Sequence, residues 1–279
     1  MSEGKSGAPR CLLPLVLCGY AVAIWALSAW LPRNAGESWL RELFHVAAIL
    51  TVLVLGTRRV LSVPGAIVCL VVGVALLRLR VLDSPGIRGT IGFSISDAGL
   101  MVACIGAGQI VSRMIKAPNV LVPVGVAAAL VDTVGVYVGF VAKAVRYNQE
   151  AVVAVSSSLP TASAANVPLA SLGPGDILFM ALFLTCLAKF RLDVKAVAAW
   201  LFIAVAGVFA LLMLTEVGDK MVIPGLPVIV AASILPSARS FSFSKEEKRS
   251  LLIAAAIMIP MLAIVTLLGR LAAAWLGWR

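Results

Sequence analysis

The stretch Gly173-Pro174-Gly175-Asp176 opens an unbroken apolar run that extends over residues 177–184. A carboxylate in such a segment is costly, because an ionisable side chain near the centre of a bilayer raises the insertion free energy by about 2.5 to 3.5 kcal/mol. Two glycines and a proline directly before the aspartate predict a loosened start of the helix, where backbone groups as well as the side chain are accessible. This stretch is therefore the first candidate for a functional site.

The composition of the 279-residue chain predicts an all-α, polytopic membrane protein. Hydrophobic residues make up 61% and charged residues 13% of the sequence, which is more apolar than a soluble domain needs to be. The net charge is +10, but Lys and Arg occur singly or in pairs between apolar runs, as is typical of residues that flank transmembrane helices. Because no basic stripe is present, we expect the lipid bilayer and not nucleic acid as a partner.

Apolar runs predict about nine transmembrane helices in a single domain, residues 1–279. Each span needs roughly 20 mainly apolar residues, although short ones occur. The predicted spans are 11–31, 43–56, 60–77, 91–115, 117–145, 169–188, 193–214, 223–235 and 251–276. Residues 1–116 hold four N-terminal spans, residues 117–236 hold the candidate site, and residues 237–279 form a polar loop and one additional span.

The predicted span 91–115 is the least apolar of the nine. It contains Ser94, Ser96, Asp97 and Gln109. Because polar groups without partners are costly in lipid, we expect this helix to face other helices.

The sequence contains no pattern typical of a metal site, a disulfide framework or a histidine-based triad. The five cysteines lie in apolar segments without a CxxC pair, which is typical of small buried side chains. His45, the single histidine, starts an apolar run, and we interpret it as a packed or interfacial residue. No GxSxG motif accompanies it. We expect no metal and no cofactor.

A second carboxylate, Asp132, lies inside the predicted span 117–145. It precedes Lys143 by 11 residues, which is about 16 Å of helix. Asp176 precedes Lys189 by 13 residues, or about 20 Å, and then lies about 10 Å from the other surface of a core of about 30 Å. The two spans are antiparallel and joined by one connection, so the carboxylates are predicted at similar depth and can face each other.

Two carboxylates within a few ångströms of each other in a low dielectric cannot both ionise, and they hold one proton between them. The neutral member can act as general acid and the ionised member as general base on one water, as in aspartic proteases. Hydrolysis of an amide inside a membrane also requires water and a substrate backbone outside a helix. Glycines and prolines at residues 173–175 and in Pro224-Gly225-Leu226-Pro227 loosen helices in this way.

Each of these features has a simpler interpretation when taken alone. A buried aspartate in a multi-span protein often bonds to another helix or relays protons. A Gly-Pro-Gly-Asp stretch is often a turn, and proline is common in the first turn of a helix. Their combination on successive spans indicates a site.

The three motifs resemble those of the GxGD intramembrane aspartyl proteases, specifically the presenilin and signal-peptide-peptidase group. Asp132, in Val131-Asp132-Thr133, is similar to the first catalytic aspartate of that group, and Gly173-Pro174-Gly175-Asp176 resembles the motif with the second. Pro224-Gly225-Leu226-Pro227 resembles the Pro-Ala-Leu signature of a later span. The resemblance covers residues 117–236. Type IV prepilin peptidases also carry a GxGD aspartate, but the third motif favours the presenilin group.

The chain departs from the family pattern at three positions. Val131 stands where the family usually has tyrosine, Pro174 where it often has leucine, and Gly225 where it has alanine. Four predicted spans rather than five precede Asp132, and one additional span follows the third motif.

The resemblance implies a presenilin-like helical bundle that acts as an intramembrane aspartyl endopeptidase on transmembrane peptides or proteins. Asp132 and Asp176 would be catalytic, and the expected substrate-binding residues are Gly173, Pro174, Gly175, Pro224, Gly225, Leu226 and Pro227. Residues 150–155 have a strand-like composition, and would pair with an unwound substrate or form a surface loop. The compact chain fits the cytoplasmic membrane of a prokaryote; the oligomeric state and orientation stay open.

The alternative is a membrane protein without enzymatic activity. In one form it is a proton-coupled carrier, in which Asp97, Asp132 and Asp176 form a relay. In the other it is a catalytically silent scaffold.

Overall fold

The computed structural model describes residues 17–23, 26, 38–58, 60–77, 87–137, 172–214 and 224–275. Residues 17–23 are helical, and two short 3-10 turns, η3 (Pro118–Val120) and η4 (Leu235–Ser240), precede α5 and follow α10. The α-helices are α2 (Ser38–Thr57), α3 (Val63–Leu77), α4 (Ile87–Ser112), α5 (Leu121–Tyr137), α8 (Pro174–Lys189), α9 (Val194–Leu214), α10 (Leu226–Ile234) and α11 (Lys245–Trp275).

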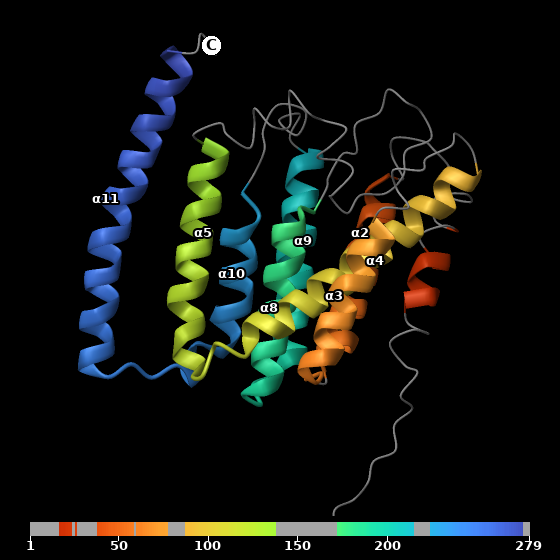
Figure 1. Ribbon diagram of the computed structural model, residues 1–279, viewed down its shortest axis with the longest axis horizontal. Helices are drawn as coiled ribbons and strands as arrows, with labels where there is room; N and C mark the ends of the chain where they lie inside the picture. The colour runs from red at the N-terminus through yellow and green to blue at the C-terminus, as the bar shows by residue number, and fades with distance from the viewer. Residues whose placement is uncertain are drawn as a thin grey trace, which may run out of the picture.

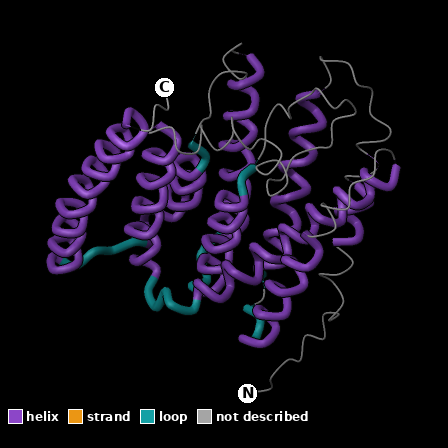
Figure 2. Tube along the Cα trace, turned by 45° about the horizontal axis from the view of Figure 1, so that its top comes forward, coloured by secondary structure: helices purple, strands orange, loops and turns teal. Residues whose placement is uncertain are grey.

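The described residues are helical except for a few short connections and an isolated bridge residue at Leu172 (Figures 1 and 2). The predicted all-α class is confirmed for this part of the chain. In the bundle, α10 packs against both α5 and α9, α2 packs against α9, and α3 packs along α4. Helix α11 stands at one edge and contacts α5 (Figure 1).

Helix α8 is the central element of the bundle. It packs against α2, α4, α9 and α10, and Ile177 and every residue from 180 to 187 are buried. A helix covered on all sides requires such a continuous apolar run. At its end, Nζ of Lys189 donates hydrogen bonds to the carbonyl oxygens of Ser112 (2.9 Å) and Ile115 (2.7 Å), at and just after the end of α4, where carbonyl groups have no full set of partners within the helix. These contacts fix α8 along its length.

Small residues bring α3 and α4 into close contact. A Cβ built on Gly106 would lie 2.6 Å from the backbone N of Leu70, and one on Gly99 would lie 2.6 Å from Cβ of Leu76. Both distances are below any real contact of this kind, so a side chain at either position would push the two helices apart. Close approach of backbones at glycine is a common way to pack helices in membranes.

Gln109 joins α4 to the connection between α2 and α3. Its Oε1 accepts a hydrogen bond of 2.6 Å from the backbone N–H of Leu61, and its Nε2 donates one of 3.2 Å to the carbonyl oxygen of Gly56. Arg113, one turn later, donates to the carbonyl oxygen of Leu61. These side chains satisfy backbone groups at the end of α2 and in the turn that follows it. The prediction that the polar residues of this span face other helices is confirmed at Gln109.

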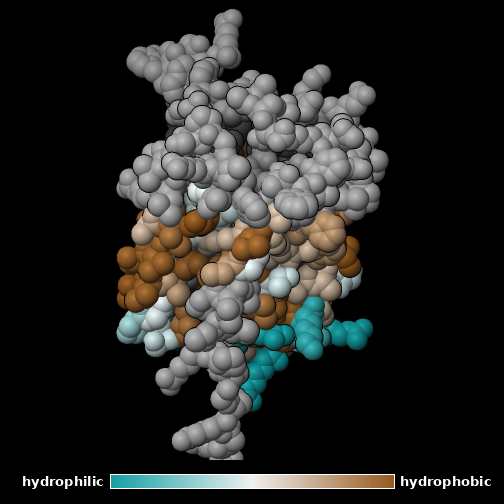
Figure 3. All heavy atoms as spheres, turned by 90° about the vertical axis from the view of Figure 1, so that its right-hand side faces the viewer, coloured by the Kyte–Doolittle hydropathy of each residue, from teal (hydrophilic) through white to brown (hydrophobic). Residues whose placement is uncertain are grey.

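Several polar side chains of this protein lie inside the bundle, and many large apolar side chains lie on its outer surface. Ser94, Ser96, Asp97 and Gln109 of α4 are at most 1% exposed. Large apolar side chains of α3 and α11 are exposed instead, with Val71 at 61% and Leu252 at 71%, and Figure 3 shows a band of apolar surface with hydrophilic residues at its lower edge. An outer surface of this kind is suited to lipid.

Three of the described helical segments are long and apolar enough to cross a membrane, judged by length and composition. They are Ser94–Ser112, Pro118–Val136 and Val194–Leu211. Shorter apolar helices are Leu43–Thr57, Val63–Leu77 and Leu226–Ser240. The chain therefore has the features of a helical membrane protein.

Several predicted boundaries differ from the observed ones. The polar segment 237–250, predicted as a loop, contains η4 up to Ser240 and is helical again from Lys245. Helix α8 begins at Pro174 and not at residue 169, and α11 continues through Pro260. Most of the predicted span 11–31 and residues 150–155 lie outside the described residues.

The cysteines with a described environment are all free. Cys104 and Cys186 are buried, Cys69 is half-buried and Cys18 is exposed. The prediction of small buried side chains is right for Cys104 and Cys186 and wrong for Cys18.

Candidate functional site

Asp132 lies in the second half of α5 and reaches the start of α10. Its Oδ2 accepts a hydrogen bond of 3.0 Å from the backbone N–H of Leu226. Leu226 is the first residue of α10, and the first N–H groups of a helix have no partner within that helix. The positive end of the helix dipole favours a carboxylate there. Because Gly225 has no side chain to cap the helix, α5 supplies the cap.

Asp176 is the third residue of α8. Its Oδ2 accepts a hydrogen bond of 3.1 Å from the backbone N–H of Gly173, the residue directly before the helix. This is half of a capping box, since Gly173 has no side chain to return the bond. Pro174 at the first helical position needs no hydrogen-bond acceptor. The Gly-Pro-Gly-Asp stretch is therefore a helix start that orients the Asp176 carboxyl.

The start of α10 also touches Asp176. A Cβ built on Gly225 would lie 2.7 Å from Oδ1 of Asp176 and 3.0 Å from its Cγ. A methyl group cannot lie this close, so glycine is required at position 225 as long as the Asp176 carboxyl keeps its place. A Cβ built on Gly175, in contrast, would meet nothing within 4 Å.

Asp132 and Asp176 therefore meet at one helix start. The N–H of Leu226 binds the first carboxyl, and its neighbour Gly225 lies against the second. Both side chains are half-buried, so solvent and small groups can reach them. The sequence predicted that they face each other across a helix pair; the structure adds the first turn of α10 to that pair.

A contact between small and apolar residues brings α5 to this position. A Cβ built on Gly125 would lie 2.8 Å from Cγ1 of Val230 in α10 and 3.0 Å from Cζ of Phe183 in α8. Gly125 and Asp132 are seven residues apart, which is about two turns and hence the same face of α5. The close contact at Gly125 directs Asp132 towards the starts of α8 and α10.

The structure brings the predicted substrate-binding residues together at the starts of α8 and α10. They range from exposed (Pro174 and Gly175) through half-buried (Gly173, Pro224, Gly225 and Pro227) to buried (Leu226). Their contact with a substrate stays a prediction.

Cys104 and Val131 are neighbours of the site that contact its backbone or lie on its outer side. The Cys104 thiol of α4 donates a weak hydrogen bond of 3.6 Å to the carbonyl oxygen of Pro174. Val131, beside Asp132, is 58% exposed. The start of α8 is thus tied to α4, and the outer side of the site is apolar.

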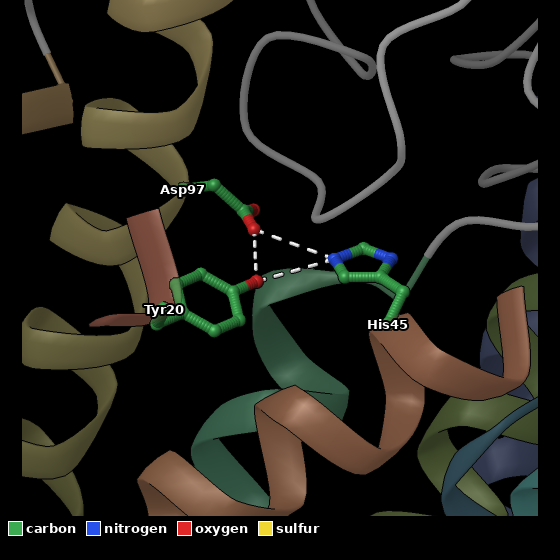
Figure 4. A network of polar contacts seen from close by, with 3 residues as sticks. All are labelled: Tyr20, His45 and Asp97. Carbon is green, nitrogen blue, oxygen red and sulfur yellow. Dashed lines mark hydrogen bonds and ion pairs between the residues drawn. The ribbon is translucent and has the colours of Figure 1, made fainter. Parts of the chain in front are cut away.

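A second polar cluster lies away from this pair, between the helical segment 17–23, α2 and α4 (Figure 4). The O–H of Tyr20 donates to Oδ2 of Asp97, and Nε2 of His45 lies 3.2 Å from the Tyr20 oxygen and 3.4 Å from Oδ2 of Asp97. His45 is 2% exposed and Asp97 fully buried, so the interpretation of His45 as a packed residue is confirmed. The sequence analysis missed Tyr20, although a tyrosine in an apolar run usually has a hydrogen-bond partner.

Within the described residues, no group of three or more His, Cys, Asp or Glu side chains is placed to hold a metal ion. No family model, curated protein or solved structure significantly matches the chain. The family resemblance therefore rests on the three sequence motifs.

Proposed function

We propose that the protein is an intramembrane aspartyl endopeptidase and that Asp132 and Asp176 are its catalytic residues. The observation that carries the proposal is the meeting of two half-buried carboxyls, from α5 and α8, at the first turn of α10. Two neighbouring carboxyls repel each other when both are ionised, which favours a state in which the pair holds one proton. That state is the one an aspartic protease uses.

The pair would activate one water. The ionised carboxylate takes a proton from the water as it adds to the carbonyl carbon of the scissile amide, and the neutral carboxyl donates its proton to the carbonyl oxygen. When the tetrahedral diol collapses, the protonated carboxyl gives its proton to the amide nitrogen and the C–N bond breaks. A diol hydroxyl gives its proton to the ionised carboxylate as the carbonyl re-forms, so the pair again holds one proton. The N–H groups of Leu226 and Gly173 occupy Oδ2 of Asp132 and of Asp176, which fixes both carboxyls during these steps.

Helix capping alone is a weaker explanation of the same contacts. A cap needs one carboxylate at a helix start, whereas the start of α10 is bonded to Asp132 and also lies against Asp176. Placing two acids together has an electrostatic cost that a single cap avoids. The catalytic proposal accounts for both acids.

We further propose nine transmembrane helices in a presenilin-like bundle, in the cytoplasmic membrane of a prokaryote. The exposed start of α8, at Pro174 and Gly175, and the half-buried residues before α10 lie beside the carboxyls and are suited to contact an unwound substrate segment. The substrate class we propose is transmembrane peptides or proteins, since Val131, beside Asp132 on α5, is an exposed apolar side chain suited to contact with lipid or an apolar segment.

Cleavage of a reporter transmembrane peptide by the purified full-length protein in liposomes tests the proposal. Asp132→Asn and Asp176→Asn should each reduce turnover by roughly 10² to 10⁴ times, the range of general acid–base catalysis. Asp193→Asn is the matched control, since Asp193 accepts from the N–H groups of Lys195 and Ala196 at the start of α9 and has no second carboxyl to share a proton with. Undiminished cleavage by Asp176→Asn would overturn the proposal.

The proton-coupled carrier remains the alternative. A relay from Asp97 to Asp176 would run along α4, where Met101 and Cys104 follow Asp97 on the same face and are buried. Neither side chain passes protons readily. Proton flux into proteoliposomes that Asp97→Asn abolishes, without any peptide cleavage, would favour the carrier.

A further inference from the structure

Four connections between helices meet at one end of the bundle and carry basic side chains. They join α2 to α3, α4 to α5, α8 to α9, and α10 to α11 (Figure 1). Lys189, at the end of α8, donates to carbonyl oxygens at the end of α4, and Arg113 donates to the connection between α2 and α3. The Asn119 side chain, before α5, donates to the carbonyl oxygen of Ser242. We call this surface the basic end; its described residues are 58, 113–120, 189–195 and 235–249.

The basic end is strongly positive. Its described residues include ten Lys or Arg and three acidic residues, which gives a net charge of +7. Asp193 and Glu247 accept hydrogen bonds from backbone N–H groups at the starts of α9 and α11, so both of these acids already cap helices. Hydrophilic residues lie at the lower edge of the apolar band in Figure 3. A surface with this charge attracts anions.

Lys116, Arg191 and Lys195 are exposed cations of the basic end. Among the described residues, none of the three charged groups has a hydrogen-bond or ion-pair partner. Lys189 differs from them, because its Nζ binds the carbonyl oxygens of Ser112 and Ile115. Those bonds hold the end of α8 against the end of α4. Lys116 follows directly after one end and Arg191 shortly after the other, so both cations flank the same contact between helix ends.

The backbone at Arg191 indicates that its side chain has a function outside the fold. Its φ is 59°, in the left-handed region that glycine adopts freely and that is unfavourable for residues with a Cβ. The N–H of Leu192 donates a hydrogen bond of 2.9 Å to the carbonyl oxygen of Leu187, which is the closure of a helix that usually has glycine at position 191. Since no described residue binds the guanidinium, a ligand outside the protein is the better reason for arginine here.

The place of the basic end along the bundle indicates which anion it meets. The candidate spans Ser94–Ser112, Pro118–Val136 and Val194–Leu211 each have one terminus at this surface, so its charges lie where apolar helices leave the hydrocarbon core. Met114, two residues before Lys116, is 80% exposed. A long apolar side chain beside cations is suited to the boundary between acyl chains and headgroups. Nucleic acid or a soluble acidic protein would leave it in water.

We propose that the basic end binds the phosphate headgroups of anionic phospholipids, with Lys116, Arg191 and Lys195 as the principal contacts. The guanidinium of Arg191 can donate two hydrogen bonds to one phosphate, and the two lysines add point charges. The interaction is independent of the proposed peptidase activity. The carboxyl pair lies at the starts of α8 and α10, whereas the basic end lies where these two helices end.

Native mass spectrometry of the full-length protein in an uncharged detergent tests the proposal. Phosphatidylglycerol and phosphatidylcholine are added at equal concentrations, and the lipid retained on the protein is counted. Phosphatidylglycerol should be retained preferentially, and less of it as the salt concentration rises. Equal retention of the two lipids would overturn the proposal and leave the charges to water or to a soluble acidic partner. Displacement of phosphatidylglycerol by an equal concentration of inorganic phosphate would assign the site to free phosphate instead.

Arg191→Gly separates lipid binding from folding. Because glycine adopts a φ of 59° without a steric penalty, this variant should unfold in lipid-free detergent at the wild-type temperature or above it. Combined with Lys116→Gln and Lys195→Gln, it should lower the affinity for phosphatidylglycerol at least about tenfold, since each basic residue near an anionic surface contributes roughly fivefold. Undiminished retention by this triple variant would overturn the assignment to these residues.

The matched control keeps the three charges. Arg191→Lys combined with Lys116→Arg and Lys195→Arg should retain phosphatidylglycerol close to the wild-type level, because attraction to a charged headgroup depends mainly on the number of cations. A loss as large as that of the charge-removing triple variant would show that the shape of these side chains, and not their charge, carries the effect, and would contradict the proposal.

Discussion

Two regions of the molecule place carboxyl groups inside predicted spans: the pair of Asp132 and Asp176, and the cluster around Asp97. The two regions differ in the hydrogen-bond partners of these carboxyls and in their burial. The pair receives its hydrogen bonds from backbone N–H groups at helix starts and stays half-buried. Asp97 receives its bonds from the side chains of Tyr20 and His45 and is fully buried.

A half-buried carboxyl can take part in a reaction, whereas a fully buried one can only contribute to the structure. A reacting group must be reached by water and substrate, and irregular backbone at the starts of α8 and α10 leaves that access. A group that substrate cannot reach contributes through its internal bonds, so its loss is expected to affect stability and not turnover.

The largest contrast is expected in stability. His45→Leu leaves the Asp97 carboxyl buried without its base and should lower the free energy of unfolding by about 3–5 kcal/mol. Asp176→Asn should lower it by less than about 1 kcal/mol, because Asn is also a good acceptor at a helix start. Denaturant or thermal unfolding in detergent measures both. Equal losses in the two variants would mean that the regions do not differ in this way.

The contact between Gly225 and Asp176 gives the second contrast. Gly225→Ala should reduce peptide cleavage roughly 10- to 100-fold, because a Cβ would meet the carboxyl and displace it, and displacements of about 1 Å cost this much. Gly175→Ala has open space around its Cβ and should cleave at a rate close to that of the wild type. Unchanged cleavage by Gly225→Ala would show that this carboxyl has no fixed position.

The smallest effect on stability is expected at Glu247, an exposed carboxylate that caps the start of α11. A hydrogen bond from the backbone N–H of Ser244 and, to a smaller extent, one from the Asn119 side chain keep the pKa of Glu247 below its ordinary value. A lowered pKa in the folded state means that ionised Glu247 stabilises the start of α11 at neutral pH, and that this contribution is lost as the pH falls through the folded pKa. NMR titration of the carboxyl should show the low pKa, and Ser244→Gly should keep the backbone part of it. Titration at the ordinary value would contradict the cap.

The helices, and the choice of Asp132 and Asp176 as candidate site residues, could be predicted from the sequence because both depend on local patterns. Gly173-Pro174-Gly175-Asp176 carries its own helix start, and the long apolar runs define the spans. The bond from Leu226 to Asp132 joins residues 94 apart, and its register depends on how α5 and α10 pack at Gly125. No local pattern specifies that register.

The polar cluster and the start of α11 show two kinds of missed signal. Tyr20 and Asp97 are 77 residues apart, and one sequence cannot show that they meet. Ser244 and Glu247, in contrast, have the spacing of a capping box, and both of its bonds are present, at 2.7 and 3.1 Å. The polar composition of residues 237–250 was interpreted as a loop, although this motif predicts a helix there.

The most direct test of the central claim is a double-mutant cycle on turnover of a transmembrane peptide. Asp132→Asn, Asp176→Asn and the double variant are compared with the wild type, each as full-length protein in liposomes. If the two carboxyls share one proton and act as a unit, each single variant loses about as much activity as the double variant. Losses that multiply, or a single variant that cleaves like the wild type, would contradict the account.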